Sequence, residues 1–226
     1  LNSIESLKDD FISNVSHEIK TPLSVINNYT TALKDKDLPE KLREEYIEIV
    51  IESTEKLSDL VTNVLRLSKI ENRKILPEKK EYDLCRQLSD CALSFEEVWE
   101  EKNIEFIVEI EDRVILNDNF VFLDIIWHNL LSNAFKFTEN GGTVSLTETS
   151  DDEFVTVKIK DTGCGFDEET KSHIFDKFYQ GDTSHAEEGN GLGLALVQKI
   201  AERNNYIISV ESEKGKGTEF TVKIKK

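Results

Sequence analysis

The sequence predicts an α+β protein, in which a helical hairpin over residues 1–75 precedes an α/β sandwich domain over residues 76–226. The first 73 residues contain no glycine and form two apolar-periodic stretches, separated by the short polar break KDKDLPE at 34–40. Such a pattern is typical of two long helices joined by a turn. After Pro77, glycines and short alternating runs appear, which indicates a single sheet with helices on one face.

The second helix of the hairpin carries an apolar seam, with residues spaced by threes and fours. Its members are Tyr46, Val50, Leu57, Leu60, Val64 and Leu67. Two helices cannot enclose such a seam well, so we expect a homodimer that forms a four-helix bundle. The alternative, a hairpin that packs on its own C-terminal domain, also fits the pattern.

In the second domain, period-two alternation predicts strands, and longer apolar-periodic stretches predict helices. The expected strands are 104–110, 143–149, 154–160 and 218–225, and the expected helices are 84–101, 119–136 and 191–204.

Composition excludes several classes of protein. The formal charge of -17 disfavours binding to nucleic acid, whose backbone is also negative. The three cysteines form no CxxC pair, which fits a reducing cytosol better than a disulfide framework. No uninterrupted apolar stretch approaches the length of about 18 residues that a membrane span needs.

The first helix contains the stretch FISNVSHEIKTPLSVI at 11–26. His17 and Thr21 lie one helical turn apart, and Glu18 is next to His17. A neutral imidazole is a nucleophile at cellular pH, and a neighbouring carboxylate can accept its proton. Pro22 cannot donate to the carbonyl of Glu18, so the helix should kink or loosen just beyond His17.

An isolated exposed histidine usually has no function, but here the complete string HEIKTP at 17–22 resembles the phospho-acceptor box of sensor histidine kinases. The resemblance implies that His17, Glu18 and Thr21 are the catalytic residues. It also implies that Thr21 supports the reverse activity, dephosphorylation of a partner.

The stretch HNLLSNAFKFT at 128–138 places Asn129, Asn133 and Lys136 on one face of a helix. Amide oxygens can hold Mg²⁺ beside phosphate oxygens, and a lysine offsets phosphate charge. An ordinary surface helix with polar residues would look similar.

The stretch DTGCGF at 161–166 follows directly on a predicted strand, and its glycines, Gly163 and Gly165, allow a tight loop close to a flat ligand. Strand-to-loop turns use Asp and Gly routinely, so this signal is moderate by itself.

Two further stretches, IFDKFYQ at 174–180 and GNGLGLALV at 189–197, flank a predicted lid at 181–188. Glycines before an apolar helix expose N–H groups where phosphates bind, although no GxxxxGK[ST] motif of the P-loop type occurs. A closing turn, GKGTEF, follows at 215–220.

In order and spacing, these four pieces resemble the ATP-binding domain shared by histidine kinases, gyrase-type topoisomerases, Hsp90 and MutL. The resemblance implies a Mg²⁺ ligand at Asn129 and recognition of the adenine amino group by Asp161. The residues it places at ATP are Asn129, Asn133, Lys136, Phe137, Asp161, Gly163, Gly165, Lys177, Phe178, Gly189, Gly191, Leu192, Gly193 and Thr218.

The chain departs from the family pattern at a few positions. The predicted lid contains His185 but no Lys or Arg that could reach the γ-phosphate. Asn190 occupies a position where Thr or Ser is frequent, and Ile125 replaces a polar residue one turn before Asn129. Slow or conditional turnover is therefore one expectation.

The resemblance implies an ATP- and Mg²⁺-dependent protein-histidine kinase that autophosphorylates His17 and transfers the phosphoryl group to an aspartate of a response regulator receiver domain. It implies the cytoplasmic portion of a sensor, with membrane attachment only through segments outside this chain. Two alternatives stay open: a regulator phosphatase or docking scaffold that binds ATP without self-phosphorylation, and an ATP-driven conformational machine. The intact His17–Glu18 pair favours the kinase over the first alternative. The second alternative needs a water-activating carboxylate near the nucleotide, and proteins of that class lack the histidine hairpin.

Overall fold

The computed structural model describes residues 2–71, 78–181 and 189–226, with side chains from residue 11 onward. Contacts within the chain define two compact units, Leu1–Lys69 with Lys177–Leu192, and Ile70–Asp176 with Gly193–Lys226. The domain boundary expected between residues 75 and 76 lies outside the described residues and stays a prediction.

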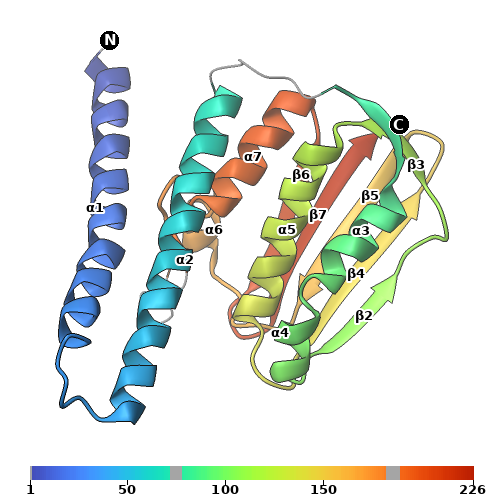
Figure 1. Ribbon diagram of the computed structural model, residues 1–226. Coiled ribbons are helices and arrows are strands. Elements are labelled where there is room, and N and C mark those ends of the chain that lie inside the picture. Colours follow the sequence, from blue (N-terminus) through green and yellow to red (C-terminus); the bar gives the residue numbers. More distant parts are fainter. Residues whose placement is uncertain (1, 72–77, 182–188) are drawn as a thin grey trace. The chain divides into compact units, whose positions relative to one another are not determined.

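The first unit contains the predicted hairpin, formed by α1 (Asn2–Ala32) and α2 (Glu40–Glu71) (Figure 1). Pro22 lies inside α1, which continues as one helix, so the proline does not end it. The turn is fastened by Arg43, whose guanidinium donates to the carbonyls of Leu33 at 3.2 Å and Asp35 at 3.0 Å. These carbonyls follow α1, and without Arg43 they would have only water as a hydrogen-bond donor.

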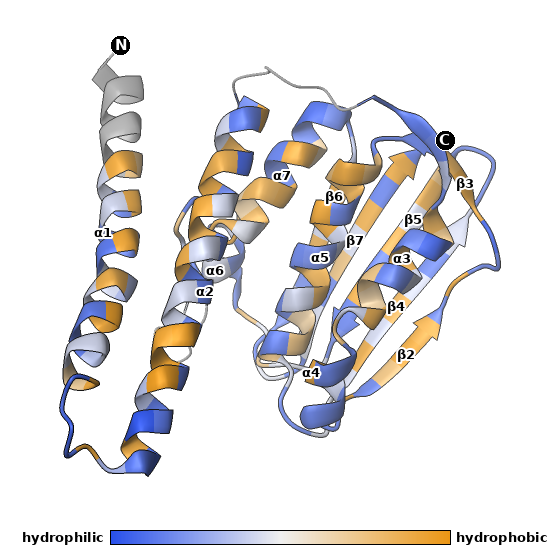
Figure 2. Ribbon diagram, viewed as in Figure 1, coloured by the Kyte–Doolittle hydropathy of each residue, from blue (hydrophilic) through white to orange (hydrophobic). Residues whose placement is uncertain are grey.

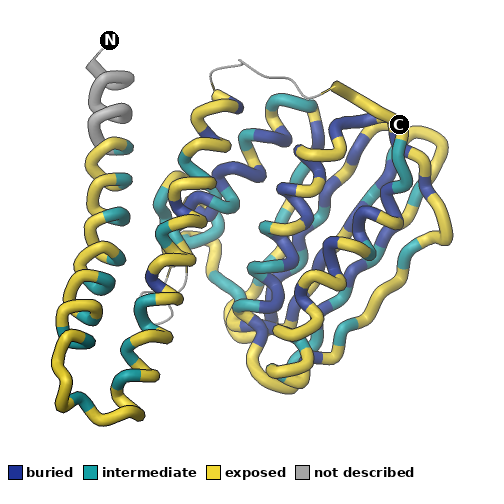
Figure 3. Tube along the Cα trace, viewed as in Figure 1, coloured by how far each residue is buried: buried dark blue, intermediate teal, exposed yellow. Residues whose placement is uncertain are grey.

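The predicted seam of α2 is at least half-buried along its length, and Leu60 and Leu67 are only 2% and 1% exposed. Most of the remaining surface of α1 and α2 is open to solvent (Figure 3). A second apolar stripe of α2 lies on this open surface and consists of Ile47, Ile51, Val61 and Leu65. No described helix is long and apolar enough to cross a lipid bilayer.

The second unit is the predicted α/β sandwich. Its helices are α3 (Leu84–Leu93), α4 (Glu96–Glu101), α5 (Phe120–Phe137), α6 (Glu168–Lys171) and α7 (Gly193–Asn204). Its strands are β1 (Lys80–Asp83), β2 (Glu105–Glu109), β3 (Ile115–Asp118), β4 (Thr143–Ser150), β5 (Phe154–Asp161), β6 (Ile207–Glu213) and β7 (Gly217–Lys225). The main sheet has the order β2-β4-β5-β7-β6, in which only the β2 and β4 pair is parallel.

One face of this sheet is apolar, because alternate residues of each central strand point to the same side. Val144 and Leu146 of β4 are fully buried there, as are Val155 of β5 and Val222 of β7. Helices α3, α5 and α7 cover this face (Figure 1), and each contains both apolar and polar residues (Figure 2). The fully buried apolar residues of these helices include Leu88, Leu130 and Leu196. The core therefore sits between one sheet and one helical layer, as the sequence predicts.

Some local features differ from the sequence prediction, which also did not include β6 or the short helix α6. The single helix expected at 84–101 is two helices, α3 and α4, because the chain turns at Ser94 and Phe95. This turn buries the Phe95 ring against His128 and Phe135, with ring centroids 4.8 and 5.5 Å away. In addition, β1 and β3 pair as a small antiparallel sheet that the sequence analysis did not predict.

Candidate functional site

The expected phospho-acceptor, His17, lies on α1 with 82% of its side chain exposed. Its Nδ1 atom is 4.0 Å from Oε1 of Glu18, which is longer than a hydrogen bond. The Thr21 hydroxyl donates to the backbone carbonyl of His17 at 3.3 Å. A ring with this exposure is accessible to a large phosphorylated substrate.

Asn129, the expected Mg²⁺ ligand, has its amide orientation fixed within α5. Its Nδ2 donates to the carbonyl of Ile125 at 2.7 Å, so its Oδ1 points away from the helix backbone. A Cβ added at Gly193, the first residue of α7, would lie only 2.4 Å from this oxygen. Glycine at this position therefore leaves the amide oxygen accessible. The Ile125 side chain belongs to the core, with 6% exposure, which explains an apolar residue there.

The C-terminal part of α5 carries the other residues expected at the phosphates. Asn133 and Lys136 are both half-buried, and they follow Asn129 at helical spacing. The Lys136 ammonium lies 4.5 Å from the ring centroid of Phe137. Phe137, the last residue of α5, is 38% exposed.

Asp161, the expected adenine acceptor, is the last residue of β5 and is only 6% exposed. Its Oδ1 accepts hydrogen bonds from the backbone N–H groups of Gly163 at 2.9 Å and Thr218 at 3.2 Å. Burial raises the pKa of Asp161 to about 6, although these two donors act in the opposite direction. Among the described residues, Oδ2 has no hydrogen-bond partner, so it is available to a ligand donor.

The glycines after Asp161 permit close backbone packing. A Cβ on Gly163 would lie 2.3 Å from the carbonyl oxygen of Phe137, and one on Gly165 would lie 2.1 Å from that of Glu213. Gly165 also has φ +55°, which favours glycine. The loop is thus held between the end of α5 and the β6–β7 turn. The sequence predicts that these glycines allow close approach to a ligand, and the structure shows that they also allow close packing of the loop against the rest of the protein.

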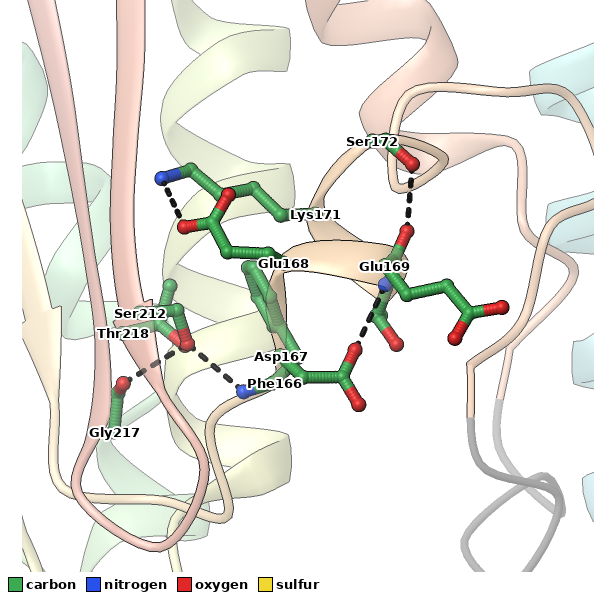
Figure 4. A network of polar contacts seen from close by, with 10 residues as sticks. Phe166, Asp167, Glu168, Glu169, Lys171, Ser172, Ser212, Gly217 and Thr218 are labelled. Atoms are coloured by element: carbon green, nitrogen blue, oxygen red, sulfur yellow. Dashed lines mark hydrogen bonds and ion pairs between the residues drawn. The ribbon is translucent and has the colours of Figure 1, made fainter.

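Ser212 on β6 is hydrogen-bonded to the end of this loop at Phe166 (Figure 4). Its hydroxyl accepts from the N–H of Phe166 at 2.9 Å and lies 3.0 Å from the hydroxyl of Thr218, which is 7% exposed. After Phe166, Asp167 caps α6 by accepting from the N–H of Thr170 at 2.8 Å. Ser212 could not be predicted from the sequence, because a serine in an alternating strand carries no distinguishing signal.

The remaining predicted residues belong to the segment 177–192 of the other unit. Within this segment, the N–H of Phe178 donates to the carbonyl of Gly191 at 2.9 Å. The carbonyl of Gly189 accepts from Nε2 of Gln180 at 2.9 Å, and Leu192 is fully buried. Lys177 begins the segment. The predicted lid with His185 lies outside the described residues.

The structure therefore brings together, within the second unit, three pairs of predicted residues that lie far apart in the sequence. They are Asn129 with Gly193, Phe137 with Gly163, and Asp161 with Thr218.

Comparison with known families agrees with both units. Residues 7–73 match the family described as "His Kinase A (phospho-acceptor) domain". Residues 118–226 match "Histidine kinase-, DNA gyrase B-, and HSP90-like ATPase".

Similar sequences include the heme sensor protein HssS of Staphylococcus saprophyticus, 35% identical over 226 residues, which span all of this chain and 48% of that protein. The sensor histidine kinase YclK of Bacillus subtilis is 29% identical, over 99% of this chain and 48% of its own length. The chain thus spans about half the length of these relatives.

Similar solved structures include the histidine kinase ThkA in complex with the response regulator protein TrrA, with a TM-score of 0.79 and 26% identity over 100% of this chain and 64% of that one. The histidine kinase AdeS of Acinetobacter baumannii shares the fold, with a TM-score of 0.75 and 21% identity over 92% of this chain and 97% of that one.

These matches define a class of protein in which a phospho-acceptor helical hairpin is joined to an ATPase domain of the histidine kinase, gyrase and Hsp90 type. The chain belongs to the sensor histidine kinases of two-component systems. An ATPase domain of this family implies the use of ATP.

Proposed function

We propose that this chain is a protein-histidine kinase that transfers the γ-phosphoryl group of ATP to His17 and then to an aspartate of a response regulator. The observation that carries the proposal is Asp161, a buried carboxylate with Oδ1 committed to two backbone donors and Oδ2 available. This arrangement suits an acceptor for the amino group of adenine. It occurs in one chain with an accessible histidine on a phospho-acceptor helix.

In the proposed reaction, a ring nitrogen of His17 attacks the γ-phosphorus of ATP. A nitrogen–phosphorus bond forms, the bond to the bridging oxygen breaks, and ADP leaves. Glu18 accepts the proton that the ring releases. Because phosphoryl transfer depends mainly on positioning and charge stabilisation, an accessible ring and an oriented carboxylate are the main requirements on α1.

The nucleotide would be held by residues from several elements of the second unit. Asn133 and Lys136 would contact the phosphates. The first N–H groups of α7, which as in any helix have no acceptor within the helix, would add favourable donors. Asn129 would supply an oxygen to Mg²⁺, which commonly takes one or two protein ligands and completes its shell with phosphate and water oxygens. The oriented Oδ1 and the space at Gly193 fit this role. When bound, Mg²⁺ would offset the charge of the phosphates.

We also propose that the chain acts as a homodimer and docks a receiver domain. The exposed stripe of α2 supports the dimer, and the similarity to a kinase solved with its response regulator supports the partner. Thr21, one turn after His17, supports dephosphorylation of that partner as a second activity. Release of phosphate from a phosphorylated receiver domain, with Thr21→Ala as the comparison, is its assay.

The kinase proposal is tested by incubating the protein with γ-labelled ATP and Mg²⁺, beside His17→Gln and His173→Gln. His173 is a matched control, because it is also an exposed histidine but lies outside α1, paired with Asp176 at 2.8 Å. We expect acid-labile, base-stable label on the wild-type chain and on His173→Gln, and none on His17→Gln. Label that persists in His17→Gln would contradict the proposal. Nucleotide binding without any label would favour the phosphatase or scaffold alternative.

A further inference from the structure

Lys102, which follows α4, binds the C-terminal end of α5. Its ammonium donates to three backbone carbonyls, those of Phe135 at 2.9 Å, Lys136 at 2.9 Å and Thr138 at 3.2 Å. Carbonyls at the end of a helix lack intrahelical donors and carry partial negative charge. One ammonium, with its three protons, therefore satisfies three of these acceptors.

The same residue also fixes the turn that follows α5. The backbone carbonyl of Lys102 accepts from the N–H of Gly141 at 2.9 Å. Side chain and backbone of Lys102 thus hold the chain on both sides of Phe137, the residue whose carbonyl lies against Gly163 in the loop after Asp161. A shift at this end of α5 would move Lys136, Phe137 and that loop together.

We propose that Lys102 is a positioning residue for nucleotide binding, which sets the backbone that presents Lys136 and Phe137. This inference rests on the proposed function, because it assumes that the nucleotide binds at these residues. The cation also offsets the partial negative charge of the helix terminus, which would disfavour an anionic ligand there. Lys102 itself need not touch the nucleotide.

A purely structural role for Lys102 would lower stability and leave nucleotide affinity of the folded protein unchanged. The two roles are separated by measuring the dissociation constant of Mg-ATP by calorimetry and, separately, the unfolding temperature without nucleotide. The variants are Lys102→Met and, as a matched control, Lys226→Met. Lys226 also donates to a backbone carbonyl, that of Asp151 at 2.7 Å, but at the end of β4 remote from Asp161.

We expect Lys102→Met to bind Mg-ATP about tenfold more weakly than the wild type, and Lys226→Met to stay within about twofold. Lys102→Arg keeps the charge but cannot direct its planar donors at three carbonyls in the same way, so an intermediate affinity is expected. If Lys102→Met does not fold, Lys102→Arg carries the test. Wild-type affinity in a folded Lys102 variant would overturn the inference.

A double-mutant cycle with Lys136→Met tests the route of the effect. If Lys102 acts through Lys136, the loss caused by Lys102→Met should be smaller in the Lys136→Met background than in the wild type. If the two substitutions weaken Mg-ATP binding by independent factors, the proposal that Lys102 positions Lys136 is overturned. A wild-type chain that binds no ATP would instead contradict the proposed function itself, so the two failures are distinguishable.

Discussion

Asp161 shows how the folded environment changes the properties of a single residue. The sequence predicts its place after a strand and, by resemblance, its role, but not its burial or its raised pKa. Ser212 and Lys102 illustrate the opposite case. Neither belongs to a motif, because each acts by hydrogen bonds to backbone groups that are distant in sequence. Such partners become visible only when the chain is folded.

The raised pKa of Asp161 makes stability depend on pH. Its folded-state pKa of about 6 exceeds its ordinary value of 3.8, so the folded protein binds the proton more tightly than the unfolded chain. The stability from this proton is present below pH 4 and is lost as pH rises to about 6. The asparagine of Asp161→Asn does not titrate, so only the wild type loses this stability. The free energy of unfolding of Asp161→Asn minus that of the wild type should therefore rise by about 2–3 kcal/mol as pH increases through this window and then level off.

Urea denaturation of both proteins without nucleotide, between about pH 4.5 and 7.5, measures this difference. Other carboxyl groups with shifted pKa values, such as Glu148, are present in both proteins and cancel. A difference that does not change with pH would show that Asp161 titrates in the folded protein as it does in the unfolded chain.

At the scale of elements, most helices and strands follow from periodicity, and the exceptions have tertiary causes. The expected helix at 84–101 is divided because burial of Phe95 against α5 competes with helix continuation. Pro22 shows the reverse, since α1 continues through a residue that usually breaks helices. The start of α7 lies against α5, and this contact sets the environment of Asn129.

The contact between α5 and α7 leads to a prediction for Gly193→Ala. The backbone there suits alanine, but the added Cβ would meet Oδ1 of Asn129 at 2.4 Å. We expect the amide to be displaced and the Mg²⁺-dependent part of ATP affinity to fall by about tenfold or more. ATP titrations with Mg²⁺ and with EDTA measure this part directly. Equal Mg²⁺ enhancement in Gly193→Ala and the wild type would argue against Asn129 as the metal ligand.

At the scale of the whole molecule, the two stripes of α2 differ in burial. The predicted seam is covered within a single chain, whereas Ile47, Ile51, Val61 and Leu65 are each more than 40% exposed. An exposed apolar stripe along a long helix is typical of a surface for association. We therefore place the homodimer contact on this second stripe, which the sequence analysis did not separate from the seam.

Ile51→Lys tests the dimer at the middle of this stripe. A buried lysine at the contact would lose hydration, so we expect the variant to be monomeric at concentrations where the wild type is dimeric. Glu52→Lys is the matched control, because it introduces the same side chain at the neighbouring exposed position. Light scattering coupled to size-exclusion chromatography gives the masses. A dimeric Ile51→Lys protein would exclude this stripe as the contact.

By itself, the sequence determined that a helical hairpin precedes an α/β sandwich, where most of the main helices and strands lie, and the motifs at His17, Asn129 and Asp161. These depend on local periodicity and on short strings of residues, which are complete within the sequence. Only the tertiary structure decided which stripe of α2 stays exposed, why Gly193 must be small, and which residues brace the Asp161 loop. Each of these is set by contacts between residues far apart in the chain, and local sequence patterns do not predict such contacts.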